Sequence, residues 1–159
     1  MNDFNTLEKW LSALTELLRA YLRATEKLLV ADLDDIERTD ELIAERGALI
    51  ARIDFARMEI TKLLDRFDAD TAALFRSMLH GETVTASLSH EEKSVYGVIL
   101  DLRSLQLDVM DKDIVNTERF RQRHNEVREH LVDLNQQKKK IEFYSNASHR
   151  ERGKLIDVK

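Results

Sequence analysis

The sequence predicts an all-α protein, an antiparallel helical bundle or hairpin with a long C-terminal helix and coiled-coil-like packing. Its 159 residues include no proline and only four glycines, so residues that break helices are rare. Charged residues make up 35% of the chain and hydrophobic residues 43%, enough for an aliphatic core between charged helices. Apolar residues also recur at spacings of three, four and seven, as in helices that pack on helices. This length predicts a single helical domain over residues 1–159.

The first two helices are expected at about residues 5–30 and 35–67. Residues 5–8 (NTLE) resemble a capping box for the first helix, and Asp34 lies three residues before Glu37 as an acidic cap for the second. Two adjacent stripes on the first helix suit a bundle helix that touches two neighbours. They consist of Phe4, Leu7, Leu11, Leu14, Leu18 and Tyr21, and of Trp10, Leu17 and Leu28.

A short third helix is expected at about residues 70–80, capped by Asp68 or Asp70. His80 and Gly81 form a good C-terminal stop signal, because glycine readily adopts the left-handed conformation that closes a helix. Residues 82–88 (ETVTASL) are the one clear loop. Residues 89–92 (SHEE) then match a capping box, which predicts the start of a long helix over about residues 90–144.

The long helix changes character along its length. An unbroken helix over about residues 91–144 would be roughly 80 Å long, more than one small core can bury. Its first part has an apolar stripe of Val95, Val98, Ile99, Leu102, Leu105 and Val109, widened by Leu100, Leu107 and Met110. Its last part restores a seven-residue spacing at Phe120, Val127, Leu134 and Ile141. We therefore expect the first part to pack on the chain and the last part to meet another molecule.

The partner-binding residues predicted in this last part are Val127, Leu131, Leu134, Ile141, Phe143 and Tyr144. The alternative is that they close the protein's own bundle or a homodimer. Residues 145–159 are expected to form a flexible or docking tail, polar at first and ending on Leu155, Ile156 and Val158. A terminus gains little by leaving three large aliphatic residues in water, so they are expected to dock on this protein's own surface or on a partner.

Charge is unevenly distributed along the chain. Residues 118–159 hold eleven Lys or Arg against seven Asp or Glu, a balance of +4, whereas residues 1–117 hold fourteen against twenty-three, a balance of −9. Nucleic-acid binding is not expected, because the pI is about 5.6 and the arginines at 119, 121, 123 and 128 spread around the helix. The chain has no cysteine, no basic or apolar leader in residues 1–4 and no long apolar run, which predicts a cytoplasmic protein that does not insert into membranes.

No pattern for catalysis or cofactor binding is found. Di-iron bundles use Glu-x-x-His, but the residues three before each histidine are Ser77, Ser87, Arg121, Val127 and Asn146. Four scattered glycines cannot build a phosphate loop, and no serine has a recognisable base and orienting partner. We therefore expect no enzyme activity, no metal and no cofactor.

Several segments resemble the flagellar export chaperones of the FliT/FlgN type. They are residues 111–116 (DKDIVN), 131–139 (LVDLNQQKK), 141–144 (IEFY) and the ending 155–159 (LIDVK). The acidic turn at 32–35 and a second helix with Arg46, Leu49, Ile50 and Arg57 are similar to that family as well.

The resemblance implies a cytosolic chaperone for one secreted flagellar subunit, such as a hook-associated or filament-cap protein. Such a chaperone binds the helical terminus of its client, prevents premature assembly and delivers the client to an export-gate component. The alternative function is a structural coiled-coil subunit or scaffold of a secretion or motility apparatus. A chaperone exchanges its partner, whereas a structural subunit copurifies with its partner stoichiometrically.

Overall fold

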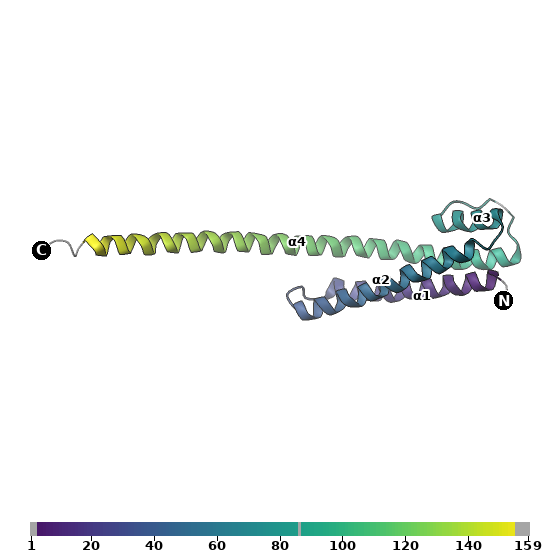
Figure 1. Ribbon diagram of the computed structural model, residues 1–159, viewed down its shortest axis with the longest axis horizontal. Coiled ribbons are helices and arrows are strands. Elements are labelled where there is room, and N and C mark those ends of the chain that lie inside the picture. The colour runs from purple at the N-terminus through teal and green to yellow at the C-terminus, as the bar shows by residue number, and fades with distance from the viewer. Residues whose placement is uncertain (1–2, 86, 155–159) are drawn as a thin grey trace. The chain divides into compact units, whose positions relative to one another are not determined.

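The computed structural model describes residues 3–85 and 87–154, with side-chain environments as far as Tyr144. Within these residues the chain forms four α-helices and no strand (Figure 1), which confirms the all-α prediction. The helices are α1 (Asp3–Val30), α2 (Ile36–Leu64), α3 (Ala69–His80) and α4 (His90–Lys154). None of the helical stretches described combines the length and the apolar character that a membrane span needs.

The chain divides into two compact units, Met1–Thr117 and Glu118–Lys159, where the sequence predicts a single domain. The division follows from where apolar side chains are buried. The main core cluster begins at Leu7 and ends at Val109, inside the first unit. The boundary also coincides with the change in charge balance, from −9 in residues 1–117 to +4 in residues 118–159.

Helices α1 and α2 form a hairpin in the first unit. The heptad seam of α1 is buried as predicted, at Leu7, Leu11, Leu14, Leu18 and Tyr21. The start of α1 differs from the prediction, since the helix already begins at Asp3 and Asn5 is not its cap. Asp3 suits the first turn because a carboxylate there is favoured by the helix dipole. The cap of α2 is Asp35 rather than Asp34, and its side chain accepts a 3.0 Å hydrogen bond from the Arg38 amide.

The segment after α2 closes one end of the first unit. Helix α2 ends at Leu64, and Phe67 lies in the connection, where its ring meets those of Phe4 and Phe75 at centroid distances of 5.0 and 5.7 Å. Asp68 caps α3 by accepting a 3.0 Å hydrogen bond from the Thr71 amide, and this bond lowers the pKa of Asp68 below its ordinary value. Gly81 ends α3 with φ 89°, a conformation that favours glycine, and a Cβ there would collide with the Arg103 side chain.

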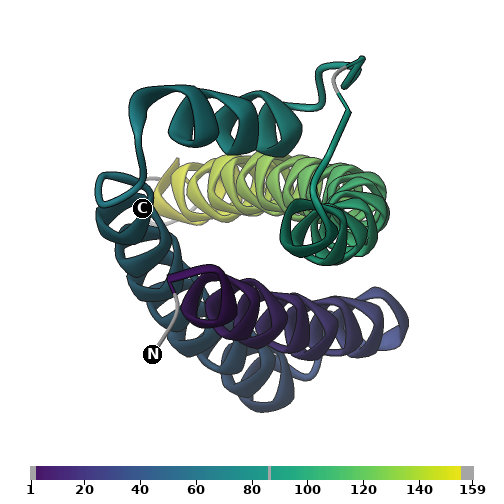
Figure 2. The ribbon, with the colours of Figure 1, turned by 90° about the vertical axis from the view of Figure 1, so that its right-hand side faces the viewer.

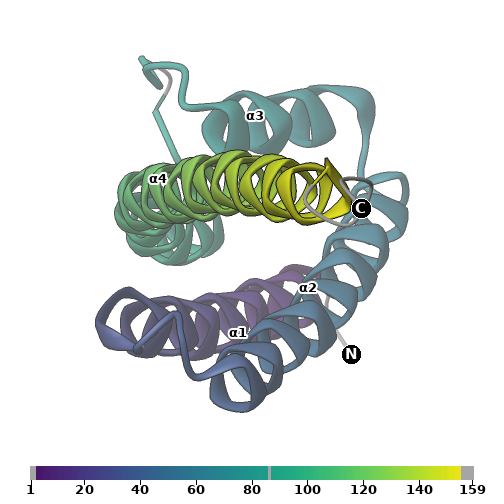
Figure 3. The same cartoon turned by 90° about the vertical axis from the view of Figure 1, so that its left-hand side faces the viewer.

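The predicted capping box at the start of α4 is present. The Glu92 carboxylate accepts a 2.7 Å hydrogen bond from the Ser89 amide, and the Glu92 amide donates back to Ser89 Oγ at 3.2 Å. Seen along its length in Figures 2 and 3, the first unit has α1 and α3 on opposite sides, with α2 and the first turns of α4 on the other two. The core of this unit lies between the four segments and includes Phe75 and Met78 of α3.

Two features of α4 differ from the sequence prediction. Leu100, Leu107 and Met110 do not widen the buried stripe but are 47%, 60% and 59% exposed, because they lie on another side of the helix from Val95, Ile99, Leu102 and Val109. Helix α4 also continues to Lys154, through most of the tail predicted at 145–159. Residues 145–152 are mostly polar but contain neither glycine nor proline, so no residue among them breaks the helix. The predicted docking residues Leu155, Ile156 and Val158 lie outside the described residues.

Candidate partner-binding surface

A polar cluster holds α4 against the α1–α2 hairpin inside the first unit. The Tyr21 hydroxyl of α1 donates a 3.0 Å hydrogen bond to the Asp113 carboxylate of α4. The Arg46 guanidinium of α2 donates to both the Asp113 carboxylate and the Tyr21 oxygen, and it lies 4.9 Å from the centre of the Tyr21 ring. Three helices therefore meet at one ion pair, whose Arg46 side chain is only 18% exposed.

The electrostatics of this cluster keep Tyr21 protonated. Burial raises the pKa of the Tyr21 phenol above its ordinary value, the positive charge of Arg46 opposes the shift, and the hydrogen bond and negative charge of Asp113 add to it. Because the phenol is neutral at pH 7, it donates to the carboxylate while its oxygen accepts from Arg46. Each group in the cluster thus has a defined role, and the contact fixes which turn of α4 faces α1.

The buried face of α4 has a strict seven-residue register. Val95, Leu102, Val109 and Asn116 are seven residues apart and all buried. A second heptad position lies four residues after each member of this set. Ile99, four residues after Val95, and Asp113, four residues after Val109, occupy it. Continued along the sequence, the second position falls at Phe120, Val127, Leu134 and Ile141. The helical register that packs in the first unit therefore continues through the part of α4 that belongs to the second unit.

Three of the predicted partner-binding residues follow this register, and Leu131 lies beside them on the same side of α4. Val127, Leu131, Leu134 and Ile141 have spacings of four, three and seven, which place them on one stripe of α4. We call these four residues the C-terminal seam. They are 43%, 56%, 59% and 68% exposed, respectively. In the first unit this heptad position holds the buried Ile99 and the partly buried Gln106 and Asp113, whereas here it holds aliphatic side chains that are open to solvent.

Phe143 does not belong to the C-terminal seam, whereas Tyr144, three residues after Ile141, lies at its edge. Phe143 is two residues after Ile141, about 200° further around the helix at 3.6 residues per turn. It shares a face with Val132, eleven residues earlier, on the side of α4 away from the seam. Both aromatic side chains are 71% exposed and their rings stack edge to face at 5.9 Å. Of the six predicted residues, four thus form the C-terminal seam, Tyr144 lies at its edge and Phe143 lies on the other side of the helix.

The C-terminal seam has the chemistry of a helix-binding stripe. Full burial of an exposed valine, leucine or isoleucine side chain contributes about 1.5–3 kcal/mol. A partner that covered these four half-exposed side chains would therefore gain several kcal/mol of binding free energy. Polar residues flank the stripe, among them the Arg123–Glu126 ion pair at 3.1 Å. An apolar stripe with charged flanks matches the face that one helix presents to another in a coiled coil.

Sequence reasoning missed two features of the first unit. Asp113 and Asn116 occupy core positions of the α4 heptad, and a polar residue in such a position could have indicated a buried polar contact. The second feature is a groove between α1 and α2 with Trp10 and Phe55 at its edge, which needs the pairing of the two helices to be known.

Among the residues whose side chains the structure describes, 3–85 and 87–144, no three His, Asp or Glu side chains come together as metal ligands would. Comparison of the chain with models of known protein families, with characterised proteins and with solved structures found no match.

Proposed function

We propose that this protein is a cytosolic chaperone that holds a helical segment of a partner protein on the C-terminal seam. The observation that carries the proposal is the exposed continuation of a packing register. In the first unit one heptad position of α4 holds the buried Ile99 and the ion-paired Asp113, and the same position further along supplies exposed aliphatic residues at Val127, Leu134 and Ile141. An amphipathic client helix with an apolar stripe would cover these residues as a partner strand covers a coiled-coil seam.

The size of the seam suits a partner that is exchanged. From Val127 to Ile141 the stripe spans four turns, about 21 Å, which is the length of a short helical segment. A surface this small supports moderate affinity, because ordering the client offsets much of the burial energy. The charge balance of +4 in residues 118–159 further favours a client helix with acidic flanks.

The resemblance to FliT/FlgN-type chaperones suggests the client class. On that basis we propose the terminal helix of a hook-associated or filament-cap subunit as client, and an export-gate component as the second partner. Holding the terminal helix would keep the client from assembling early, because assembly of such subunits by helix packing would need the same apolar stripe.

A direct test uses a pair of charge-matched double variants. Leu131→Glu with Leu134→Glu places two carboxylates in the C-terminal seam, whereas Val132→Glu with Gln136→Glu places them on the opposite face. The ligands are synthetic peptides covering the terminal helices of hook-associated and filament-cap proteins from the same organism. We expect one peptide to bind the native chain, the seam variant to bind it at least tenfold more weakly, and the control to bind normally.

Two results would contradict the proposal. Equal weakening by both double variants would show that added charge, rather than the seam, decides binding. Global unfolding of the seam variant alone, measured by circular dichroism, would support the alternative in which these residues close the protein's own core.

A permanent coiled-coil subunit is the second candidate, and the regular spacing of Phe120, Val127, Leu134 and Ile141 favours it. The two functions differ in the lifetime of the complex. A chaperone complex dissociates within the time of a pull-down competition with free peptide, whereas a structural subunit retains its partner through the same competition.

A further inference from the structure

A groove of about 720 Å³ runs along the α1–α2 hairpin, entirely within the first unit. Its floor is made of small side chains, Ala13 and Ala20 from α1 and Ala51 from α2, with Leu17 among them. Small residues let the backbone of a third helix come close to both members of the hairpin. The groove is therefore a place where one more helix could pack on the outside of this unit.

One part of the groove is aromatic. Trp10 and Phe55 face each other from the two helices, with ring centroids 6.0 Å apart in an edge-to-face arrangement. The Phe55 side chain is 54% exposed. Aromatic side chains of this kind, partly buried and fixed by a neighbour, are typical anchors of protein interfaces.

The charges in the groove are predominantly positive. Arg23 of α1 and Arg52 of α2 both line it, both are exposed, and neither forms an ion pair or hydrogen bond with another described residue. The one carboxylate in the lining, Glu16, is paired with Arg19. The lining of the groove therefore carries net positive charge, within a unit whose overall balance is −9.

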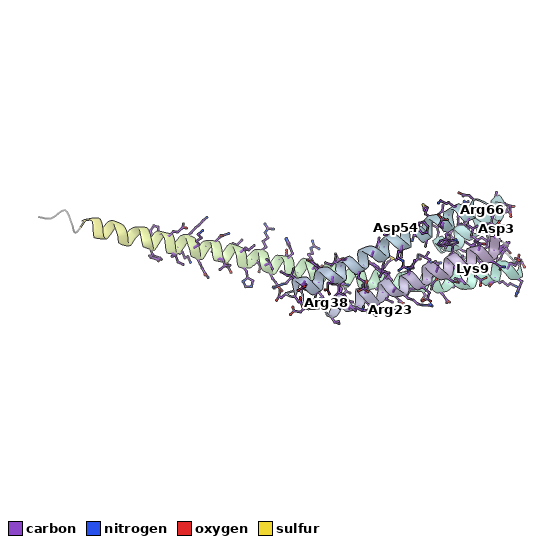
Figure 4. The ribbon with its side chains drawn as sticks, turned by 60° about the horizontal axis from the view of Figure 1, so that its bottom comes forward. Asp3, Lys9, Arg23, Arg38, Asp54 and Arg66 are labelled. Atoms are coloured by element: carbon purple, nitrogen blue, oxygen red, sulfur yellow. The ribbon has the colours of Figure 1, made fainter. Side chains whose placement is uncertain are left out.

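The length of the groove matches a helix. Trp10 and Arg23 are thirteen residues apart on α1, which corresponds to about 20 Å along the helix axis. In Figure 4, Arg23 lies on α1 between Lys9 and the turn of the hairpin, which is marked by Arg38. Arg52 is three residues before Phe55 on α2, so it lies beside the aromatic pair, whereas Arg23 lies toward the other end of the groove.

We infer that this groove binds an amphipathic helix of a partner protein, with large apolar residues toward Trp10 and Phe55 and acidic residues toward Arg23 and Arg52. Charge complementarity selects this occupant, because an acidic helix supplies the carboxylates that the two arginines lack. This surface is separate from the C-terminal seam, so it gives the protein a second docking site that does not depend on the proposed function.

The experiment exploits Trp10, which is the only tryptophan in the chain. Its fluorescence therefore reports on the groove in the intact protein without a label. Two helical peptides of about fourteen residues serve as probes, a length that fills the groove at 1.5 Å per residue. Both carry the same leucine stripe, flanked along its whole length by glutamates in one peptide and by lysines in the other.

We expect the acidic peptide to shift the Trp10 emission to the blue, saturably, and to bind about tenfold more tightly than the basic peptide. The variant Arg23→Glu with Arg52→Glu should reverse this preference. Arg57→Glu with Arg66→Glu is the matched control, because both arginines are exposed and neither lines the groove. Circular dichroism of each variant checks that the helices remain folded.

Three outcomes would overturn the inference. The first is equal binding of the two peptides, or no binding of either, to the native chain. The second is a preference that Arg23→Glu with Arg52→Glu leaves unchanged. The third is a blue shift that grows with protein concentration in the absence of peptide, which would identify a second copy of this chain as the occupant.

Discussion

Asn116 Nδ2 donates a hydrogen bond of 3.1 Å to the backbone carbonyl of Thr25, which lies 91 residues earlier in the chain. Asn116 is 2% exposed and Thr25 is fully buried, so this polar contact between α4 and α1 is shielded from water. Asn116 Oδ1 and Thr25 Oγ1, both buried, have no hydrogen-bond partner among the described residues. A single asparagine at a core heptad position is a known means of fixing the register of packed helices.

Substitutions of Asn116 test how much its hydrogen bond to Thr25 contributes to the free energy of unfolding. Asn116→Leu removes one hydrogen bond and also one unpartnered buried oxygen, so the free energy of unfolding should change by no more than about 1 kcal/mol. Asn116→Asp places an acceptor against the Thr25 carbonyl and should cost about 1–3 kcal/mol at neutral pH. Urea denaturation of the three proteins measures both changes. A leucine variant as unstable as the aspartate variant would contradict the argument.

The stability of the first unit should depend on whether one partner of the Arg46–Asp113 ion pair is replaced or both are. Asp113→Leu leaves the Arg46 charge in a site that is only 18% exposed, and we expect the free energy of unfolding to fall by about 1–3 kcal/mol. Replacing both residues, as in Arg46→Met with Asp113→Leu, removes the stranded charge and should recover most of that loss. A double-mutant cycle in urea gives the coupling energy. A cycle with additive effects would mean that the two side chains act independently.

The helices themselves were largely predictable from sequence. The heptad seam from Leu7 to Tyr21, the Gly81 stop and the capping box at Ser89 and Glu92 all depend on local spacing, which is visible in the sequence. The division at Thr117 was not predicted, although the charge balance changes at the same residue. Where a core ends depends on tertiary packing, and α4 continues through the boundary without any change in its secondary structure.

The candidate surfaces were predictable only in part. Spacing alone identifies Val127, Leu131, Leu134 and Ile141 as one stripe, and the same spacing separates Phe143 from it. Leu107 and Met110 show the limit of that reasoning. Spacing does not decide whether an apolar residue at the edge of a stripe is buried or exposed, and both of these residues are exposed. The groove near Trp10 requires the pairing of α1 with α2, which no periodicity within one helix reveals.

Tyr21 should make the first unit sensitive to alkaline pH. Its pKa is raised in the folded state, chiefly by burial, so the folded protein prefers the neutral phenol. A raised pKa gives a contribution to stability that is complete below the unfolded-state pKa, near 10, and is lost as the pH rises through the folded-state pKa. Tyr21→Phe should therefore be less stable than the native chain at pH 7, by about 1 kcal/mol for the lost hydrogen bonds.

The same variant provides the control for the pH effect. Above pH 10 the difference in stability between the native chain and Tyr21→Phe should shrink, because phenylalanine does not ionise. Tyr96→Phe is the matched substitution, since Tyr96 is partly buried against the same core but lies outside the polar cluster. Thermal melting between pH 7 and pH 11 measures all three proteins. A constant difference across this range would show that Tyr21 does not titrate with unfolding.

Ending the chain after Arg123 should leave a folded first unit that lacks the C-terminal seam. The main core cluster ends at Val109, Asn116 is the last buried residue described, and seven more residues protect its turn from fraying. We therefore expect the melting temperature of the shortened chain to lie within about 5 °C of the full-length value, because little apolar surface is lost from the core. The shortened chain should bind no client peptide at the seam, whereas its Trp10 emission should respond to the acidic peptide as in the full chain. Melting curves and fluorescence titration test the two expectations separately. An unfolded fragment would mean that residues 124–159 contribute to the core, and a folded fragment that still binds the client peptide would place the client site in the first unit.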